Sequence, residues 1–257
     1  MVKIPLEKAC ILKGLFDSPT DSGTLSCFEG LMGTAYADNE LTPKCCGIHL
    51  GEYLYIDGNS DCTDFLKEIF EYSTKNNLTI ITLNNNIQDF AKSLYGDNCV
   101  FTTRYQMSTD IHADKNHLLN NIKNLSKDYQ LVKIDKELYN QCLKNDWLEY
   151  FCKSFKDYND FSQNAFGYVI TKNGKIVSGT SAYSYYSKGY EIIIATSPDY
   201  RRQGLALISA SAFILDCLDK GKIPHWDAAN PRSLALSQKL GYTPLREYYG
   251  IKIIRNA

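Results

Sequence analysis

The sequence predicts an α/β fold, because strand-like and helix-like segments alternate along most of the chain. Residues 78–83 form an apolar, β-branched run, whereas residues 64–75 carry apolar side chains at helical spacing. Asn173-Gly174 stands between two β-rich runs, the pattern of a tight hairpin. With 257 residues, the chain is long enough for two such domains, which we place at residues 1–125 and 126–257.

In the first half, eight segments carry clear patterns. Residues 6–16 have helical spacing, and residues 25–36 and 46–56 are predicted strands. Thr63 is the expected cap of the helix at 64–75. After the buried strand at 78–83, we expect a helix at 87–94, a strand at 99–106 and a helix at 117–125. The polar stretch at 124–128 then marks the domain boundary.

The second half repeats the alternation. A strand at 129–134 is followed by a helix that Asp135 opens, by an aromatic helical segment at 147–155 and by a loop or helix at 157–164. The hairpin strands at 166–172 and 175–183 precede a strand at 191–196. A helix at 205–220, a strand at 223–228, a helix after Asn230 and a last strand from Tyr242 complete the domain.

Composition excludes several classes of protein. Lys and Arg number 28 and Asp and Glu 29, so the net charge is -1, which argues against a dedicated nucleic-acid binder. The 44% hydrophobic content excludes a disordered chain. No apolar run approaches the ~20 residues of a membrane helix, and the first residues lack a secretory pattern. Nine cysteines without a C-x-x-C pattern predict reduced thiols in a cytoplasmic protein without a metal site.

The most informative segment follows the strand at 191–196. A turn leads into Arg201-Arg202-Gln203-Gly204-Leu205-Ala206 and then into a helix. Free backbone N–H groups and the helix dipole favour an anion at such a helix start. Gly204 leaves the backbone accessible, so a pyrophosphate is the expected guest, although an ordinary turn with surface arginines would have the same residues.

A second motif follows the strand at 223–228. Asn230 is placed to cap a helix, and Pro231 fits its first turn. Gly241 then ends that helix.

Taken together, the two motifs resemble the GNAT N-acetyltransferase superfamily over residues 129–251. Its loop R/Q-x-x-G-x-G/A is matched by Arg201, Gly204 and Ala206. Its later motif N-x-x-S/A-x-x-L-x-x-K-x-G-F/Y is matched by Asn230, Ser233, Leu236, Lys239, Gly241 and Tyr242. Residues 179–183, 200–206 and 226–230 resemble a bacterial two-domain GNAT family related to zwittermicin-type antibiotic acetyltransferases. The first half resembles that family's smaller N-terminal α/β domain, as a degenerate GNAT-like copy with residues 57–60 in place of a phosphate loop.

The resemblance implies a mixed, strongly twisted sheet flanked by helices in the second half, with acetyl-CoA as co-substrate and no metal. The strand residues Ile194, Ala195 and Thr196 would pair with the pantetheine arm, and an N–H near Ala195 would stabilise the developing oxyanion. The loop and helix start would hold the pyrophosphate through Arg201, Arg202, Gln203, Gly204, Leu205, Ala206 and Leu207. Asn230 and Ser233 would contact the cofactor from the second helix.

The resemblance also implies direct attack of a neutral amine on the thioester, which needs a general base. Glu191 is the first candidate, with Asp227 and His225 as alternatives; each also has a purely structural interpretation. Many family members place an acidic Tyr where this chain has Ser237, and a Ser hydroxyl is a much weaker acid. Ser237 acting through water, Tyr242 as substitute acid, and unassisted departure of the thiolate stay open.

The acceptor class follows from the resemblance as well. We expect a primary amine of a small molecule, an antibiotic or another metabolite, and neither nucleic acid nor membrane. An aromatic group, Trp147, Tyr150, Phe151 and Phe155, either packs in the core or walls the acceptor site. The rival hypotheses are a non-catalytic acyl-CoA-binding module and, more weakly, transfer to a protein amine. A homodimer is among the oligomeric states that stay open.

Overall fold

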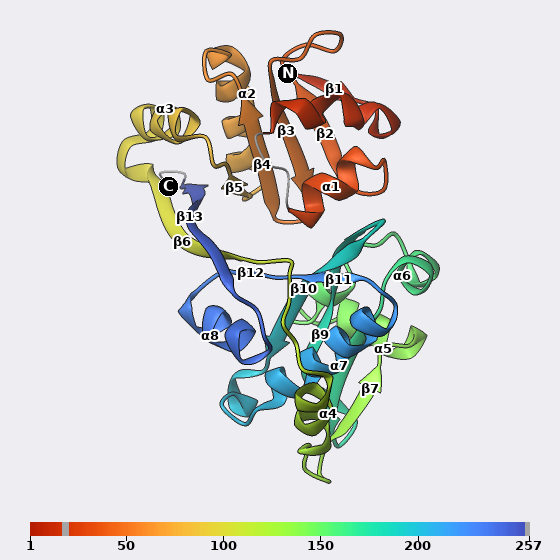
Figure 1. Cartoon of the computed structure of the whole chain (residues 1–257). Helices are drawn as coiled ribbons and strands as arrows, with labels where there is room; N and C mark the ends of the chain where they lie inside the picture. The colour runs from red at the N-terminus through yellow and green to blue at the C-terminus, as the bar shows by residue number, and fades with distance from the viewer. Residues whose placement is uncertain (17–20, 255–257) are drawn as a thin grey trace. The chain divides into compact units, whose positions relative to one another are not determined.

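The computed structural model describes residues 1–16 and 21–254, and the chain divides into two compact units (Figure 1). Unit 1 comprises Met1–Tyr105 and Arg246–Ala257, and unit 2 comprises Gln106–Leu245. The division differs from the boundary that we expected near residue 125. Residues 106–125 group with unit 2, and the chain returns to unit 1 at Arg246.

Unit 1 is a twisted sheet with helices on both faces. Its strands are β1 (Val2–Ile4), β2 (Thr34–Ala37), β3 (Cys45–Leu50), β4 (Tyr53–Gly58), β5 (Thr79–Ile81), β6 (Cys99–Met107) and β13 (Pro244–Ile253). Its helices are η1 (Leu6–Leu15), α1 (Ser22–Phe28), α2 (Thr63–Lys75), α3 (Asn85–Tyr95) and η2 (Gly96–Asn98). Within unit 1 the strands follow the order β1-β2-β3-β4-β5-β13-β6, with β4 and β5 parallel and the last strand of the chain, β13, antiparallel to β5.

Two apolar cores cover the two faces of this sheet. Adjacent residues of a strand point to opposite faces, and Cys45 and Cys46 belong to different cores. The first core contains Phe65, Leu66, Ile69 and Phe70 of α2 together with Leu54, Ile56, Ile80 and Ile87. The second contains Ala9 and Leu12 of η1, Cys27 and Phe28 of α1, and Ile4 and Ile48. The sheet is therefore buried from both sides.

Unit 2 has a smaller mixed sheet in the order β11-β10-β9-β8-β7. Its strands are β7 (Gln130–Lys133), β8 (Gly167–Lys172), β9 (Lys175–Tyr186), β10 (Gly189–Thr196), β11 (Ile223–His225) and the short β12 (Asp227–Ala228). Its helices are α4 (Lys115–Lys123), α5 (Lys136–Leu143), η3 (Glu149–Phe151), α6 (Tyr158–Asn164), η4 (Pro198–Tyr200), α7 (Leu205–Asp219) and α8 (Pro231–Lys239). Neighbouring strands are antiparallel except β10 and β11.

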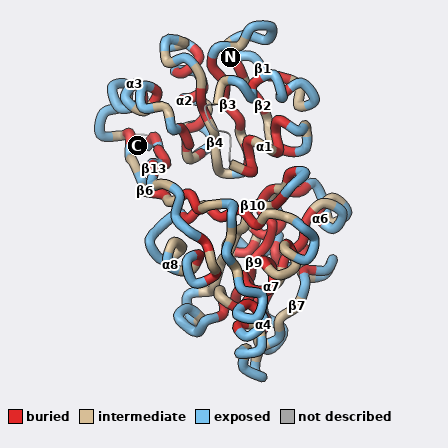
Figure 2. The backbone as a smooth tube through the Cα atoms, in the orientation of Figure 1, coloured by how far each residue is buried: buried red, intermediate tan, exposed pale blue. Residues whose placement is uncertain are grey.

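Helix α7 is the centre of unit 2. It packs on β8, β9 and β10, and α4 packs on it in turn. Figure 2 shows α7 and β9 as largely buried. Leu205 and Ile208 of α7 pack with Ile170 and Val177, which fixes the first turn of the helix against the sheet.

Several sequence predictions are confirmed. Asn173 and Gly174 have φ of 51° and 75°, the left-handed conformation that a two-residue hairpin turn needs. Helices α2 and α7 lie where the periodicity placed them. Asn230 caps α8 by accepting from the backbone N–H of Arg232 and Ser233.

Other predictions are wrong, each because packing or a turn overrides a short apolar pattern. Residues 25–36 are not one strand, because the first part belongs to α1, which packs against η1. Residues 46–56 form two strands, since Gly51 makes a left-handed turn at φ 58°. The N-cap of α2 is Cys62 and not Thr63.

In unit 2, two predicted elements are shorter than expected. The segment at 147–155 contains only the short helix η3, although Phe151 and Phe155 are buried. The strand at 223–228 is divided at Trp226 into β11 and β12, which belong to different sheets. The Trp226 carbonyl instead accepts a bond from the Met107 N–H at 3.2 Å.

No helix within the described residues is long and apolar enough to cross a membrane.

Candidate functional site

The candidate site begins where β10 and β11 part. Their parallel pairing covers only Gly189 to Glu191, which lies opposite His225. An irregularity between Glu191 and Ile192 also interrupts the ladder with β9. From Ile192 to Thr196, β10 follows β9, and its other edge has no ladder partner among the described residues. That edge offers backbone groups to an extended ligand, as an unpaired strand edge does.

The loop between β10 and α7 has an unusual backbone. Arg202 has φ of 61° and Gly204 has φ of 78°, so two residues close together adopt left-handed conformations. For an L-residue such as Arg202 this costs about 1–2 kcal/mol. A Cβ added at Gly204 would meet nothing within 4 Å. The glycine is therefore required by its backbone angle, and the space beside it is open.

This backbone leaves a row of donors without partners. Within the described residues, no hydrogen bond is donated by the backbone N–H groups from Arg202 to Leu207. Residues 201–204 are exposed, and they precede the N-terminus of a 15-residue helix. Left-handed turns followed by a helix start converge N–H groups on one point, where the helix dipole also favours negative charge. The arrangement suits an anion, which makes this loop the candidate binding site.

Two side chains stiffen the loop. Gln203 donates to the Asp199 carbonyl at 3.3 Å and accepts from the Tyr129 hydroxyl at 2.8 Å. Arg201 donates through Nε to the Thr196 carbonyl at 3.3 Å, and this bond links the loop to the end of β10. The sequence-predicted loop residues thus lie together, although Leu205 is buried and contributes packing.

Asn230 and Ser233 lie on the first turn of α8. The Asn230 side-chain oxygen accepts from Arg232 N at 3.1 Å and from Ser233 N at 3.0 Å. The Ser233 hydroxyl accepts from the Trp226 indole N–H at 3.0 Å. Both side chains therefore have local roles, and their contact with a cofactor stays a prediction.

Glu191 is the candidate base, and it lies at the point where the strands part. Its Oε1 accepts from the Asp227 backbone N–H at 3.1 Å, which ties the carboxylate to the beginning of β12. Glu191 is half-buried. The alternative base, His225, is buried, and its Nε2 lies 2.9 Å from the Tyr186 hydroxyl. Burial lowers the pKa of His225 from 6.5 to about 4, so its ring is neutral at pH 7.

The two candidate acids are both buried and both donate to main-chain carbonyls. The Ser237 hydroxyl donates to the Leu234 carbonyl at 2.8 Å within its own helix. The Tyr242 hydroxyl donates to the Pro224 carbonyl at 2.8 Å. Burial raises the pKa of Tyr242 well above its ordinary value, so this phenol holds its proton firmly.

The aromatic residues after α5 pack mainly in the core. Phe155 stands edge-on to Phe161, with ring centroids 5.2 Å apart, and lies near-parallel to Tyr185 at 6.2 Å. Phe151 is completely buried. This favours the packing interpretation for Phe151 and Phe155 over an acceptor wall.

The sequence reasoning missed a group of hydroxyls beneath the loop. Ser178, Thr180 and Ser209 are completely buried. The Ser178 hydroxyl bonds to the Thr196 hydroxyl of β10, and the Thr180 hydroxyl bonds to the Ser209 hydroxyl of α7. The signal in the sequence was weak but present, since Ser178 and Thr180 are polar residues at alternate positions of a strand that is otherwise buried.

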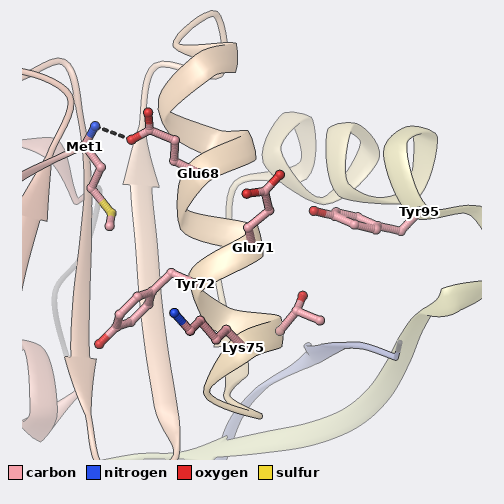
Figure 3. A pocket seen from close by; sticks show the side chains of 7 residues that line it. Met1, Glu68, Glu71, Tyr72, Lys75 and Tyr95 are labelled. Carbon is pink, nitrogen blue, oxygen red and sulfur yellow. Dashed lines mark hydrogen bonds and ion pairs between the residues drawn. The ribbon is translucent and has the colours of Figure 1, made fainter. Parts of the chain in front are cut away.

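A cavity of about 540 Å³ lies apart from these residues, in unit 1 (Figure 3). Its lining residues are Met1, Glu68, Glu71, Tyr72, Thr74, Lys75 and Tyr95. The Tyr72 hydroxyl is 2.7 Å from Nδ1 of His49, and the Met1 amino group bonds to Glu68. None of the predicted site residues lines this cavity. No group of His, Cys, Asp and Glu in residues 1–16 and 21–254 is arranged to hold a metal ion.

Comparison with known proteins gives matches over nearly the whole chain. A family model described as GNAT acetyltransferase matches residues 13–251. A curated relative, the uncharacterized N-acetyltransferase YdfB of Bacillus subtilis (strain 168), is 26% identical over 224 residues. The alignment covers 84% of this chain and 84% of the relative.

Solved structures show the same extent of similarity. A GCN5-related N-acetyltransferase-like protein from Streptococcus suis 89/1591 is 30% identical, with a TM-score of 0.87, over 96% of this chain and 99% of its own. A tandem GNAT protein from the clavulanic acid biosynthesis pathway has a TM-score of 0.58 and 11% identity, over 96% of this chain and 92% of its own. At that identity the second likeness concerns the fold alone.

Proposed function

Because the chain belongs to the GNAT acetyltransferase family, we propose that it transfers an acetyl group from acetyl-CoA directly to the primary amine of a small molecule. The observation that carries the proposal is the row of backbone donors from Arg202 to Leu207 at the start of α7. It stands next to the strand edge that β11 leaves uncovered. Acetyl-CoA supplies an activated acyl group as a thioester, and the chain supplies binding and proton transfer.

The residues present suit such a molecule. A diphosphate is an anion with several acceptor oxygens, and the backbone N–H groups together with Arg201 and Arg202 provide donors and positive charge. The edge of β10 from Ile192 to Thr196 provides the alternating backbone groups with which an amide-containing arm pairs. Asn230 and Ser233 complete the proposed set from α8.

Glu191 is the proposed general base. An acceptor amine is protonated in water near neutral pH and must lose a proton before its nitrogen attacks a carbonyl. A carboxylate at the place where β10 and β11 part takes that proton and passes it to solvent. Its bond from the Asp227 N–H holds the carboxylate at this place.

For the departing thiolate, the geometry favours departure without a protein acid. The protons of Ser237 and Tyr242 are engaged by the Leu234 and Pro224 carbonyls. Using either proton would require breaking a buried hydrogen bond, at a cost of about 1–3 kcal/mol. A thiol also ionises far more readily than an alcohol, so its thiolate leaves easily.

The proposed acceptor is a small amine, in keeping with the resemblance to zwittermicin-type antibiotic acetyltransferases. The chain has a net charge of -1, which gives no general attraction for a polyanionic or polycationic macromolecule. Four residues of β9, Tyr183 to Tyr186, precede the candidate site and are mostly buried. A non-catalytic acyl-CoA-binding module is the rival, and turnover decides between the two.

Two measurements test the proposal. Calorimetry of the purified chain with CoA and acetyl-CoA measures binding, which we expect for both. Release of free thiol from acetyl-CoA, followed over a panel of small amines, measures turnover. Absence of binding contradicts the whole proposal, whereas tight binding with no turnover for any amine supports the rival module.

A further inference from the structure

The interface between β9 and α7 contains hydroxyl groups where apolar side chains are usual. Ser178 and Thr180 occupy alternate positions of β9 and so project from the same face of the sheet. Thr180 meets Ser209 of α7, with 2.8 Å between the two hydroxyl oxygens. Ser178, Thr180 and Ser209 are all completely buried. Buried hydroxyls are costly unless they are bonded, so an arrangement that satisfies all of them has a specific geometry.

The first hydroxyl pair secures the end of β10. The Ser178 hydroxyl donates to the Ala195 carbonyl at 3.2 Å and lies 2.7 Å from the Thr196 hydroxyl. Because a hydroxyl has a single proton, Thr196 must then be the donor to Ser178. The last two residues of β10 are thereby bonded to one side chain of β9.

The second pair secures the start of α7. The Ser209 hydroxyl donates to the Ala206 carbonyl at 3.3 Å, so Thr180 is the donor to Ser209. Ala206 belongs to the first turn of the helix. The first turn of α7 is therefore connected to β9 at Thr180, two residues after Ser178, where β9 is connected to β10.

Between the two attachment points, β9 packs closely against its neighbours. Gly179 lies between Ser178 and Thr180, and a Cβ added there would come within 2.8 Å of the Phe151 ring and 3.0 Å of the Tyr168 carbonyl oxygen. The backbone of β9 therefore leaves no space for a side chain at this position. Both ends of the loop at 197–204 are fixed to this one strand segment.

We propose that the hydroxyl pairs Ser178–Thr196 and Thr180–Ser209 are positioning residues, which set the spacing between the end of β10 and the start of α7 at which the loop N–H groups converge on a diphosphate. The inference rests on the proposed function, which it extends by naming residues that do not touch the ligand. The strained backbone at Arg202 needs such support, because a left-handed L-residue persists only where its surroundings hold it.

The test uses the Thr180–Ser209 pair. Thr180→Val keeps the shape of the side chain and removes the hydroxyl, so we expect CoA to bind about fivefold to tenfold more weakly in calorimetry, as for the loss of one buried hydrogen bond. Pantetheine lacks the diphosphate, and its affinity in an NMR titration should change by less than about twofold. Thr180→Ser restores the hydroxyl and should restore CoA binding.

Ser211 provides the matched control. It is a buried serine of the same helix that donates to the Leu207 carbonyl at 2.7 Å, but it faces Asn121 of α4. Ser211→Ala should leave the affinity for CoA within about twofold while lowering stability to a similar degree. Thermal unfolding of each variant shows whether a weaker affinity for CoA comes from a changed distance between β10 and α7 or from unfolding of the protein.

Two results would overturn the inference. One is a folded Thr180→Val protein that binds CoA as tightly as wild type; the other is an equal loss for CoA and pantetheine. If Thr180→Val does not fold, Ser209→Ala breaks the same pair and is judged by the same criteria. Wild-type protein that binds no CoA contradicts the proposed function as well, so the two failures are distinguishable.

Discussion

The two units contain the same sequence of elements around a parallel strand pair. In unit 1, β4 pairs with β5 over Tyr53–Tyr55 and then leads into α2. In unit 2, β10 pairs with β11 over Gly189–Glu191 and then leads into α7. In both, the partner strand is followed by a helix with an asparagine cap, Asn84 or Asn230.

The two loops differ in whether hydrogen bonds within the protein already close them. In unit 1 the Asn84 side chain donates to the Gly58 carbonyl at 3.0 Å, across the place where β4 and β5 diverge. The Asn59 N–H is also used, by the Lys44 carbonyl at 2.7 Å. Asp61 and Asp64 stand at the start of α2, where they favour the helix and repel an anion.

In unit 2 the corresponding loop has arginines, two left-handed residues and backbone N–H groups that donate no hydrogen bond to any residue in the described part of the chain. Under the proposed function, topology alone does not make an anion site: the donors must also be left without internal partners, and nearby charges must have the right sign. Function belongs to the site and not to the fold.

The largest expected effect concerns Glu191, the proposed general base of unit 2. Glu191→Gln preserves the acceptor oxygen for the Asp227 N–H and removes the base. We expect kcat to fall about 100- to 10,000-fold, the range for general-base catalysis, with CoA affinity unchanged. Steady-state kinetics on an accepted amine measures it. A kcat within about twofold of wild type would transfer the role to Asp227, which Asp227→Asn examines in parallel.

The glycines of the two loops should behave in opposite ways, and Gly58→Ala has the larger effect on stability. Its φ is 113°, and a Cβ there would lie 2.4 Å from the Lys44 carbonyl oxygen. We expect a loss of about 3–4 kcal/mol in the free energy of unfolding, with CoA affinity retained in the folded fraction. Urea titration checks this. A weakened affinity for CoA would place a ligand site in unit 1 after all.

Acid sensitivity should come in part from His225 in unit 2. Burial lowers its pKa from the ordinary 6.5, which the unfolded chain retains, to about 4 in the folded chain, so only the unfolded chain gains a proton between these values. This contribution to stability is intact above pH 6.5 and is lost as the pH falls towards 4, by up to about 3 kcal/mol. Urea unfolding at several pH values should show a smaller loss for His225→Gln. Equal losses in both proteins would refute the assignment.

Reversing the two loop charges should weaken CoA binding by about 2–3 kcal/mol, or roughly 30- to 150-fold. Arg201→Glu combined with Arg202→Glu replaces the attraction of the loop for a diphosphate by repulsion, while its N–H groups remain. Calorimetry should also give one CoA per wild-type chain, because the loop of unit 1 is closed. Lys175→Glu, an exposed charge reversal on the β8–β9 hairpin, is the control and should have little effect.

Gly204→Ala should have the smallest effect. The φ of 78° is unfavourable for Ala, but the added Cβ meets no atom within 4 Å. We expect CoA to bind about 1–2 kcal/mol more weakly because the loop relaxes away from the left-handed conformation. The thermal midpoint of the protein should stay close to wild type. A large drop in that midpoint would mean that the glycine serves the fold and not the ligand.

The structural features that the sequence predicts are those that depend on residues close together along the chain. Some residues act only on their own backbone or on residues within four positions, so their effects can be predicted from the sequence. These residues are Asn173, Gly174, Gly204, Asn230 and Gly241. The order of strand, loop and helix around the candidate site was predictable for the same reason. The helix at Ser22–Phe28 was not, because its short apolar run suits a strand equally well until η1 packs against it.

Side-chain orientation was also beyond the sequence. Ser237 and Tyr242 match a motif, yet the proton of each is engaged by a carbonyl that only packing brings within reach. The same holds for Thr180 and Ser209, which are far apart along the chain and 2.8 Å apart in space. Spacing along one element does not encode such long-range pairs.

Propensities and hydrogen bonds of near neighbours account for the α/β alternation, the loop after β10 and the caps of the helices around it, so the amino-acid sequence predicts these features. Only the folded chain shows that β13 joins β5 in unit 1, that Asn84 closes one loop, and that buried hydroxyls support the other. Strand partners and buried contacts depend on which distant segments exclude water together, and that is settled only when the whole chain folds.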